Sequence, residues 1–133
     1  RYLRYRNTKT GQVTKHHAAD GETFGAAGLF MSARDMAKLG LLYLGGGVYG
    51  GKRILSADWV REATRPQITE TGGEYYGYGF WLYPGIGFAA TGAYSQVILA
   101  MPEDNAVLAA HAYNTEGFDY PEMIRRIKAS GIR

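Results

Sequence analysis

The sequence contains no cysteine among its 133 residues. This absence excludes disulfide frameworks, thiolate catalysis and zinc sites with cysteine ligands. It leaves the compartment open, with the periplasm or the cell exterior favoured over the cytoplasm. The chain begins at Arg1 rather than at a methionine. We therefore expect a fragment or a processed product, whose first residues carry no information about export.

Long hydrophobic runs are also missing, because glycine interrupts each apolar stretch within a dozen residues. A membrane-spanning helix needs about 20 consecutive apolar residues, so the sequence predicts no membrane span. The shares of hydrophobic and charged residues, 46% and 20%, are those of a globular protein. At this length we expect one domain over residues 1–133.

The chain as a whole has a net charge of +3. Acidic residues are scarce at its two ends. Residues 1–15 contain basic residues and no acidic one: Arg1, Arg4, Arg6, Lys9 and Lys15. The basic residues near the other end are Arg125, Arg126, Lys128 and Arg133. A nucleic-acid surface usually gathers basic residues on one face together with stacking aromatics. Here the basic residues are divided between the two chain ends, and most aromatics lie between those ends, so we expect no nucleic-acid partner.

Clusters of metal ligands are absent as well. His16 and His17 are neighbours, and adjacent side chains in an extended segment face opposite ways. We therefore expect a solvated loop there rather than a metal site. His111 falls within an apolar segment and is interpreted as a hydrogen-bonded structural histidine. We expect neither a metal nor a cofactor.

Helix signals occur in three places. The clearest follows Ser32, whose hydroxyl can accept a hydrogen bond from the backbone N–H of Asp35. Apolar residues then recur at steps of three and four until a run of three glycines, so the sequence predicts a helix over 33–44. A shorter capped helix is predicted after Ser56, and an amphipathic helix over 120–129.

The remaining apolar segments are typical of strands, with a period of two from Tyr75 onward. We predict four strands, over residues 75–83, 87–91, 96–101 and 106–113. Residues 1–28 are expected to be irregular apart from a short strand over 2–6, and residues 67–74 to form a polar loop. Short turns between consecutive strands force antiparallel pairing. The predicted fold class is therefore α+β, an antiparallel β-meander with flanking helices.

Four motifs occur along the chain in an order that one known family shares. They lie at residues 27–37, 42–60, 76–81 and 90–102. They resemble the family's Gly-Leu-x-Ser-Thr-x-x-Asp-Met-Ala helix start, its Leu-Tyr-Leu-Asn-Gly-Gly and Gly-Lys-Arg-Ile-Leu-Ser segment, its Tyr-Gly-x-Gly-Trp strand and its active-site strand. The family is the serine β-lactamase and penicillin-binding-protein superfamily, in its class C β-lactamase and esterase branch. The resemblance implies the C-terminal part of a β-lactamase/transpeptidase-like fold.

The nucleophile of this superfamily has no counterpart in the sequence. In the family it comes from Ser-x-x-Lys, whose serine is a poor nucleophile until an adjacent base takes its proton. The residues three places after the serines of this chain are Asp35, Trp59, Ile98 and Arg133. We therefore expect the family's Ser-x-x-Lys and Tyr-x-Asn elements to lie upstream of Arg1, and the chain alone to be inactive.

The family's third catalytic element has a counterpart at residues 90–92. Ala90 stands where penicillin-recognising members have the lysine of Lys-Thr-Gly, and the missing charge argues against efficient β-lactam turnover. By resemblance, Thr91 would hydrogen-bond the substrate and Gly92 would allow its close approach. The backbone N–H of Ala93 would be an oxyanion-hole donor, and Tyr94 would lie at the cleft rim. Without the resemblance these are ordinary turn residues and a surface aromatic.

Two functional hypotheses follow from the resemblance. In the first, the chain is part of a serine hydrolase that acts on a small-molecule ester, amide or β-lactam-like substrate through an acyl-enzyme. In the second, it is a non-catalytic binding or scaffold module, and Ala90 marks the loss of catalysis. In the family the last strand pairs with the N-terminal portion. Residues 106–113 would therefore expose an apolar edge, open to the missing N-terminal half or to self-association.

Overall fold

The computed structural model describes residues 3–6, 13–16, 31–69, 75–92, 94–112 and 119–131. Contacts along the chain divide it into two compact units, Arg1–Phe30 and Met31–Arg133. In the first unit, strand β1 (Leu3–Arg6) pairs antiparallel with strand β2 (Val13–His16). The sequence predicted β1 but not β2, and the single-domain organisation stays a prediction.

The second unit begins with helix α1 (Ala33–Leu44), whose bounds are those predicted. The Ser32 hydroxyl accepts from the backbone N–H of Asp35 at 3.1 Å and donates to the Asp35 carboxylate at 2.8 Å. Lys38 donates to the same carboxylate at 2.7 Å. This hydrogen bond from Lys38, followed by the one from Ser32, lowers the pKa of Asp35 below its ordinary value. The capping prediction is confirmed.

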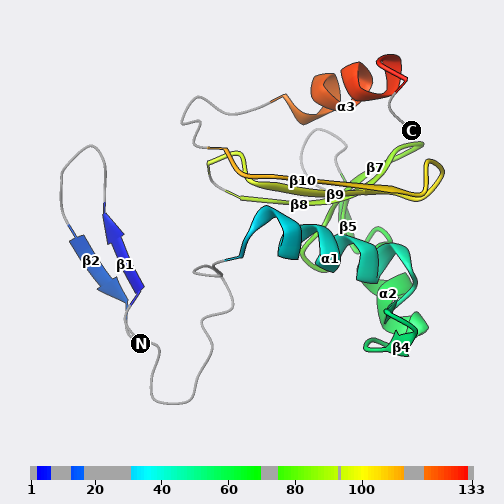
Figure 1. The fold of residues 1–133 in the computed structure, drawn as a ribbon, viewed down its shortest axis with the longest axis horizontal. Coiled ribbons are helices and arrows are strands. Elements are labelled where there is room, and N and C mark those ends of the chain that lie inside the picture. Colours follow the sequence, from blue (N-terminus) through cyan, green and yellow to red (C-terminus); the bar gives the residue numbers. More distant parts are fainter. Residues whose placement is uncertain are drawn as a thin grey trace. The chain divides into compact units, whose positions relative to one another are not determined.

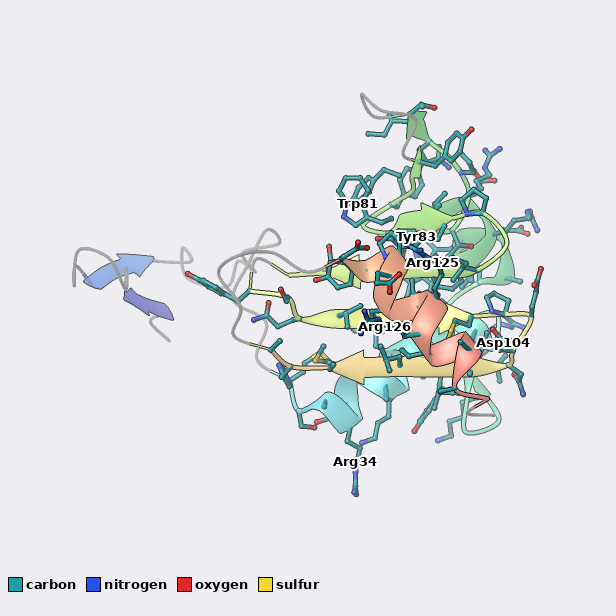
Figure 2. The ribbon with its side chains drawn as sticks, turned by 90° about the horizontal axis from the view of Figure 1, so that it is seen from above. Arg34, Trp81, Tyr83, Asp104, Arg125 and Arg126 are labelled. Atoms are coloured by element: carbon teal, nitrogen blue, oxygen red, sulfur yellow. The ribbon has the colours of Figure 1, made fainter. Side chains whose placement is uncertain are left out.

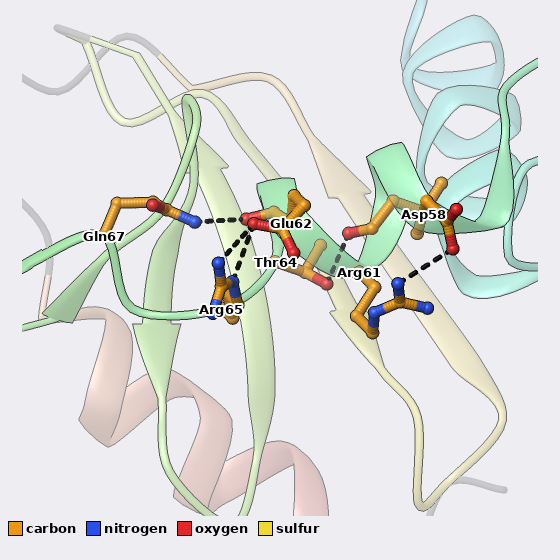
Figure 3. Close-up of polar contacts among 7 residues, drawn as sticks. Asp58, Arg61, Glu62, Thr64, Arg65 and Gln67 are labelled. Atoms are coloured by element: carbon orange, nitrogen blue, oxygen red, sulfur yellow. Dashed lines mark hydrogen bonds and ion pairs between the residues drawn. The ribbon is translucent and has the colours of Figure 1, made fainter.

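A hairpin and a second helix follow α1. Strands β3 (Val48–Tyr49) and β4 (Lys52–Arg53) pair antiparallel across a glycine turn, and helix α2 (Ala57–Ala63) begins after Ser56. The Ser56 hydroxyl caps α2 by accepting from the backbone N–H of Trp59 at 3.0 Å. After the helix ends, the side chain of Gln67 donates to the main-chain oxygen of Glu62 at 2.8 Å and so connects the following segment to the last turn of α2 (Figure 3).

A six-stranded antiparallel sheet forms the centre of the second unit, with strand order β10-β9-β8-β7-β6-β5. Its strands are β5 (Ile68–Thr69), β6 (Tyr75–Tyr76), β7 (Trp81–Tyr83), β8 (Gly87–Thr91), β9 (Val97–Met101) and β10 (Ala106–Ala110). Every neighbour in the sheet is also a neighbour in sequence. The predicted α+β meander is confirmed.

The predicted strand over 75–83 is wrong, because residues 77–80 form a turn between β6 and β7. The backbone N–H of Gly77 donates to the Phe80 carbonyl at 2.8 Å, and that of Tyr78 donates to the Ala63 carbonyl at 3.0 Å. A Cβ at Gly77 would come within 2.1 Å of the Ala63 oxygen, so only glycine lets the chain lie this close to the end of α2. The predicted polar loop over 67–74 also contains β5.

Two apolar layers cover the two faces of the sheet. Helix α3 (Tyr120–Ala129), with its predicted bounds, lies over one face, and α1 and α2 lie over the other (Figure 1). Strand β9 separates the layers. Its Val97, Leu99 and Met101 cluster with Ile124 of α3, and its Ala100 clusters with residues on the α1 and α2 side.

Helix α1 packs closely on the last two strands, β9 and β10. A Cβ at Gly40 would come within 2.5 Å of Val107 and 3.0 Å of Ile98, so this glycine lets the helix approach the sheet. On the opposite side, Arg125 and Arg126 of α3 are exposed and ion-paired with Glu122 (Figure 2). None of the helices in the described part of the chain is long and apolar enough to cross a membrane.

Candidate functional site

The candidate site is the connection between β8 and β9, where the sequence motif ends. Ala90 and Thr91 are the last two residues of β8, and both are half-buried. Ala90 packs against the apolar cluster on the α1 and α2 side of the sheet. Gly92 follows and is exposed, and Tyr94 is half-buried. Ala93, the predicted oxyanion-hole donor, lies outside the described residues.

Main-chain hydrogen bonds close this connection into a tight turn. The N–H of Gly92 donates to the carbonyl of Gln96 at 2.9 Å, and the N–H of Ser95 donates to the carbonyl of Gly92 at 3.0 Å. Ser95 has a φ of 67°, in the left-handed region that favours glycine. Its side chain is buried. A non-glycine residue persists in this conformation only where its surroundings hold it there.

Tyr120 of helix α3 is one of the residues that hold the turn in this conformation. The Tyr120 hydroxyl donates to the Gln96 carbonyl at 3.4 Å. Burial raises the pKa of Tyr120, and a hydrogen bond with the Ser95 side chain partly offsets that rise. The first residue of the helix thus contacts the turn between β8 and β9.

The Gln96 side chain also holds the turn, in a role that the sequence did not indicate. Its Oε1 accepts from the backbone N–H of Tyr94 at 3.2 Å, and its Nε2 donates to the carbonyl of Ala112 at 3.4 Å. The sequence pattern predicts only the start of a strand at Gln96. Its partner Ala112 is 16 residues away in sequence, so no local pattern could have revealed the contact.

His111 lies just beyond β10, not within it as predicted, because β10 ends at Ala110. Its ring Nε2 lies 2.9 Å from the carbonyl oxygen of Met31, which precedes α1. The hydrogen bond expected for a structural histidine is present, although the side chain is exposed. Strand β10 ends at Ala110 because Ala110 lies opposite Val97, the first residue of its partner β9.

An open pocket of about 370 Å³ lies at the opposite end of β8. Its lining comes largely from the β7–β8 turn and from Pro102 and Glu103, and it is mainly apolar. It includes none of residues 90–94. We place the candidate site at the β8–β9 turn rather than at this pocket, because the turn carries the sequence motif.

One sequence motif was overlooked. The chain does contain one Tyr-x-Asn spacing, at Tyr5-Arg6-Asn7, while the upstream position of the family's own Tyr-x-Asn element stays a prediction. Tyr5 lies in β1, opposite Thr14 of β2, whereas the family's tyrosine lies in a loop. Asn7 lies outside the described residues.

Possible metal ligands do not gather anywhere among the described residues, since no group of three or more His, Asp or Glu side chains could hold an ion there. The described polar groups of the turn include the Thr91 hydroxyl, the Gln96 carboxamide and the N–H groups of Gly92, Tyr94 and Ser95, which donate within the turn.

Comparison with known proteins gives one family. The family model described as Beta-lactamase matches residues 2–131, nearly the whole chain. No curated protein matches the chain. The matched range includes every residue of the candidate site.

Proposed function

Because the chain belongs to the beta-lactamase family, we propose that it is part of a serine hydrolase that transfers an acyl group through a serine acyl-enzyme. We assign it to the C-terminal portion of the class C β-lactamase and esterase branch. The observation that carries the proposal is the tight turn after Thr91. It falls where the family has Lys-Thr-Gly, and both main-chain bonds and side chains hold it.

In this proposal the chain provides the oxyanion-stabilising side of the cleft. Negative charge develops on the substrate carbonyl oxygen when the serine attacks, and fixed N–H donors stabilise it. The N–H of Ala93 is one donor, and the N–H of the nucleophile is the other. Thr91 hydrogen-bonds the substrate, with Gly92 beside it and Tyr94 at the cleft rim.

The substrate class follows from Ala90. A lysine here would place a positive charge near a substrate carboxylate, and alanine places none. Ala90 also packs against an apolar cluster. We therefore propose esters and amides without a required carboxylate ahead of β-lactams, which need that charge.

The nucleophile must come from elsewhere, because none of the serines in the 133 residues begins a Ser-x-x-Lys. We expect the chain alone to hydrolyse neither nitrocefin nor p-nitrophenyl esters. The chain together with any upstream serine-bearing polypeptide should hydrolyse the esters. Saturable turnover by the chain alone would show that its nucleophile is present after all.

A matched pair of threonine variants tests the site within the complete protein. Thr91→Val removes one hydroxyl at the proposed site, and we expect kcat/KM to fall about five- to tenfold, the worth of one hydrogen bond. Thr69→Val makes the same change in an exposed residue of β5, the edge strand three strands away from β8, and should leave kcat/KM unchanged. Equal effects of the two variants would remove Thr91 from the site.

The second candidate is a non-catalytic binding or scaffold module, favoured by the alanine at position 90. The coding sequence upstream of Arg1 separates the two. A Ser-x-x-Lys there supports the hydrolase, and a sequence without one supports the module.

The partner of either form is proposed to be a strand. Strand β10 ends the sheet order, and in the described part of the chain its outer edge pairs with no other strand. Such an edge is a template for pairing, here with the N-terminal half or with a second copy. Sedimentation velocity over a concentration series should show self-association of the chain, which an added N-terminal half suppresses. A monomer at every concentration, unchanged by that half, would refute edge pairing.

A further inference from the structure

The Gln96 carboxamide connects two segments that the strands do not connect. Through Oε1 it accepts from the Tyr94 N–H inside the β8–β9 turn, and through Nε2 it donates to the Ala112 carbonyl beyond the end of β10. A carboxamide has both an acceptor and two donors, so one side chain satisfies main-chain groups of opposite polarity. Neither a carboxylate nor an apolar side chain can do this.

Gly92 leaves room for the carboxamide, because it has no side chain. A Cβ at position 92 would come within 2.3 Å of Gln96 Oε1 and 3.2 Å of Gln96 Cβ. Any side chain at 92 would therefore displace the carboxamide from Tyr94. The glycine of the motif has a role within the turn itself, independent of any substrate.

The turn needs such a connection because it contains Ser95 in a left-handed conformation, at φ 67°. That conformation is unfavourable for a residue with a side chain. The two main-chain bonds at Gly92 and Ser95 close the turn. The Tyr94 N–H lies between them, and Gln96 fixes it to β10.

We infer that Gln96 is a positioning residue of the acyl-transfer site, whose carboxamide locks the β8–β9 turn to the end of β10 and so fixes the turn that carries the proposed oxyanion donor. The inference rests on the proposed function for its catalytic consequence. The connection itself stands on geometry alone. Gln96 contacts no substrate and acts through the main chain.

Hydrogen exchange of the Tyr94 amide, measured by NMR on the chain, tests the connection without any enzyme assay. In Gln96→Leu, which keeps a side chain of similar volume but loses both hydrogen bonds, the Tyr94 amide should exchange at least about fivefold faster. Gln67→Leu is the matched control, because Gln67 also donates to a main-chain oxygen, at 2.8 Å, in a different loop (Figure 3). It should leave the Tyr94 rate unchanged. Equal rates in all three proteins would overturn the inference.

A double-mutant cycle with Gly92 excludes a general loosening of the fold. Gly92→Ala should raise the Tyr94 exchange rate as Gln96→Leu does, since both remove the carboxamide from its place. The double variant should exchange no faster than either single variant, because the same bond is lost only once. Multiplicative effects on the rate would mean that Gly92 and Gln96 act independently, against the inference.

The catalytic consequence is read in the complete, serine-bearing protein with a p-nitrophenyl ester. Gln96→Leu should lower kcat about 10- to 100-fold with KM within about twofold, as expected when a catalytic group is slightly misplaced. Gln67→Leu should keep both constants. An active wild type whose kcat is unaffected by Gln96→Leu overturns the inference and leaves the proposed function standing. A wild type without turnover instead overturns the proposed function, and the catalytic role of Gln96 with it.

Discussion

Strands β9 and β10 have the same length and the same apolar character, yet they differ in burial. All five residues of β9 are buried, whereas all five of β10 are half-buried. They pair residue by residue, with Leu99 opposite Leu108. The difference therefore comes from position in the sheet, because β9 has a strand on each side and β10 on one side only among the described residues. Hydrophobicity alone does not say which strand will be central.

The pair Leu99 and Leu108 gives the largest expected contrast. Leu99 is completely buried and leaves a cavity when truncated, so Leu99→Ala should lower the free energy of unfolding by about 3–4 kcal/mol. Leu108→Ala removes the same atoms from a half-buried position and should cost about 1–2 kcal/mol. Urea denaturation of both variants checks this. Equal losses would mean that β10 is as enclosed as β9, for example by a partner at its edge.

A substitution at Gly40 tests how closely α1 packs against β9 and β10. Alanine is a better helix former by about 1 kcal/mol, yet a Cβ at this position would overlap Val107 of β10. Overpacking costs about 1–3 kcal/mol, so Gly40→Ala should destabilise the fold by roughly 1 kcal/mol net. Adding Val107→Ala makes room for the new methyl. In a double-mutant cycle the two changes should then cost less than their sum, and additivity would argue against close contact.

The smallest expected effect lies at the start of α1, away from the sheet. The pKa of Asp35 is lowered by its hydrogen bond from Lys38 and then by that from Ser32. A lowered carboxyl pKa stabilises the fold above the unfolded value and loses that contribution as the pH falls through the folded value. Asp35→Asn should therefore be slightly less stable than the wild type at neutral pH. The difference should vanish under acid conditions, as followed by thermal unfolding. A difference that persists in acid would assign the effect to something other than the carboxylate.

Local signals predicted the helices better than the strands. The bounds of α1 follow from Ser32 and the glycines after Leu44, and those of α3 from its periodicity, because caps and amphipathic faces are local chemistry. The turn at Gly77 escaped prediction, since a period of two continues through it and the docking on Ala63 is a tertiary contact.

The candidate site was predictable only in part. The resemblance marked residues 90–94, and the structure describes four of those five positions. The role of Gln96 could not be predicted, because a carboxamide has no local pattern and its partner Ala112 belongs to another segment. The end of β10 at Ala110 was missed for a related reason, since it is set by the start of the partner strand β9 at Val97 while the apolar pattern continues past it.

The order of the sheet also bears on how the second unit assembles. Each strand pairs only with its neighbours in the chain, so the loops that must close during pairing are short, and folding of the meander should be rapid. Helix α1 is the exception, because it comes first in this unit yet packs on β10, the last strand. We expect α1 to dock late, once the whole sheet has formed. Its packing on β10 would then be the last step in the folding of this unit.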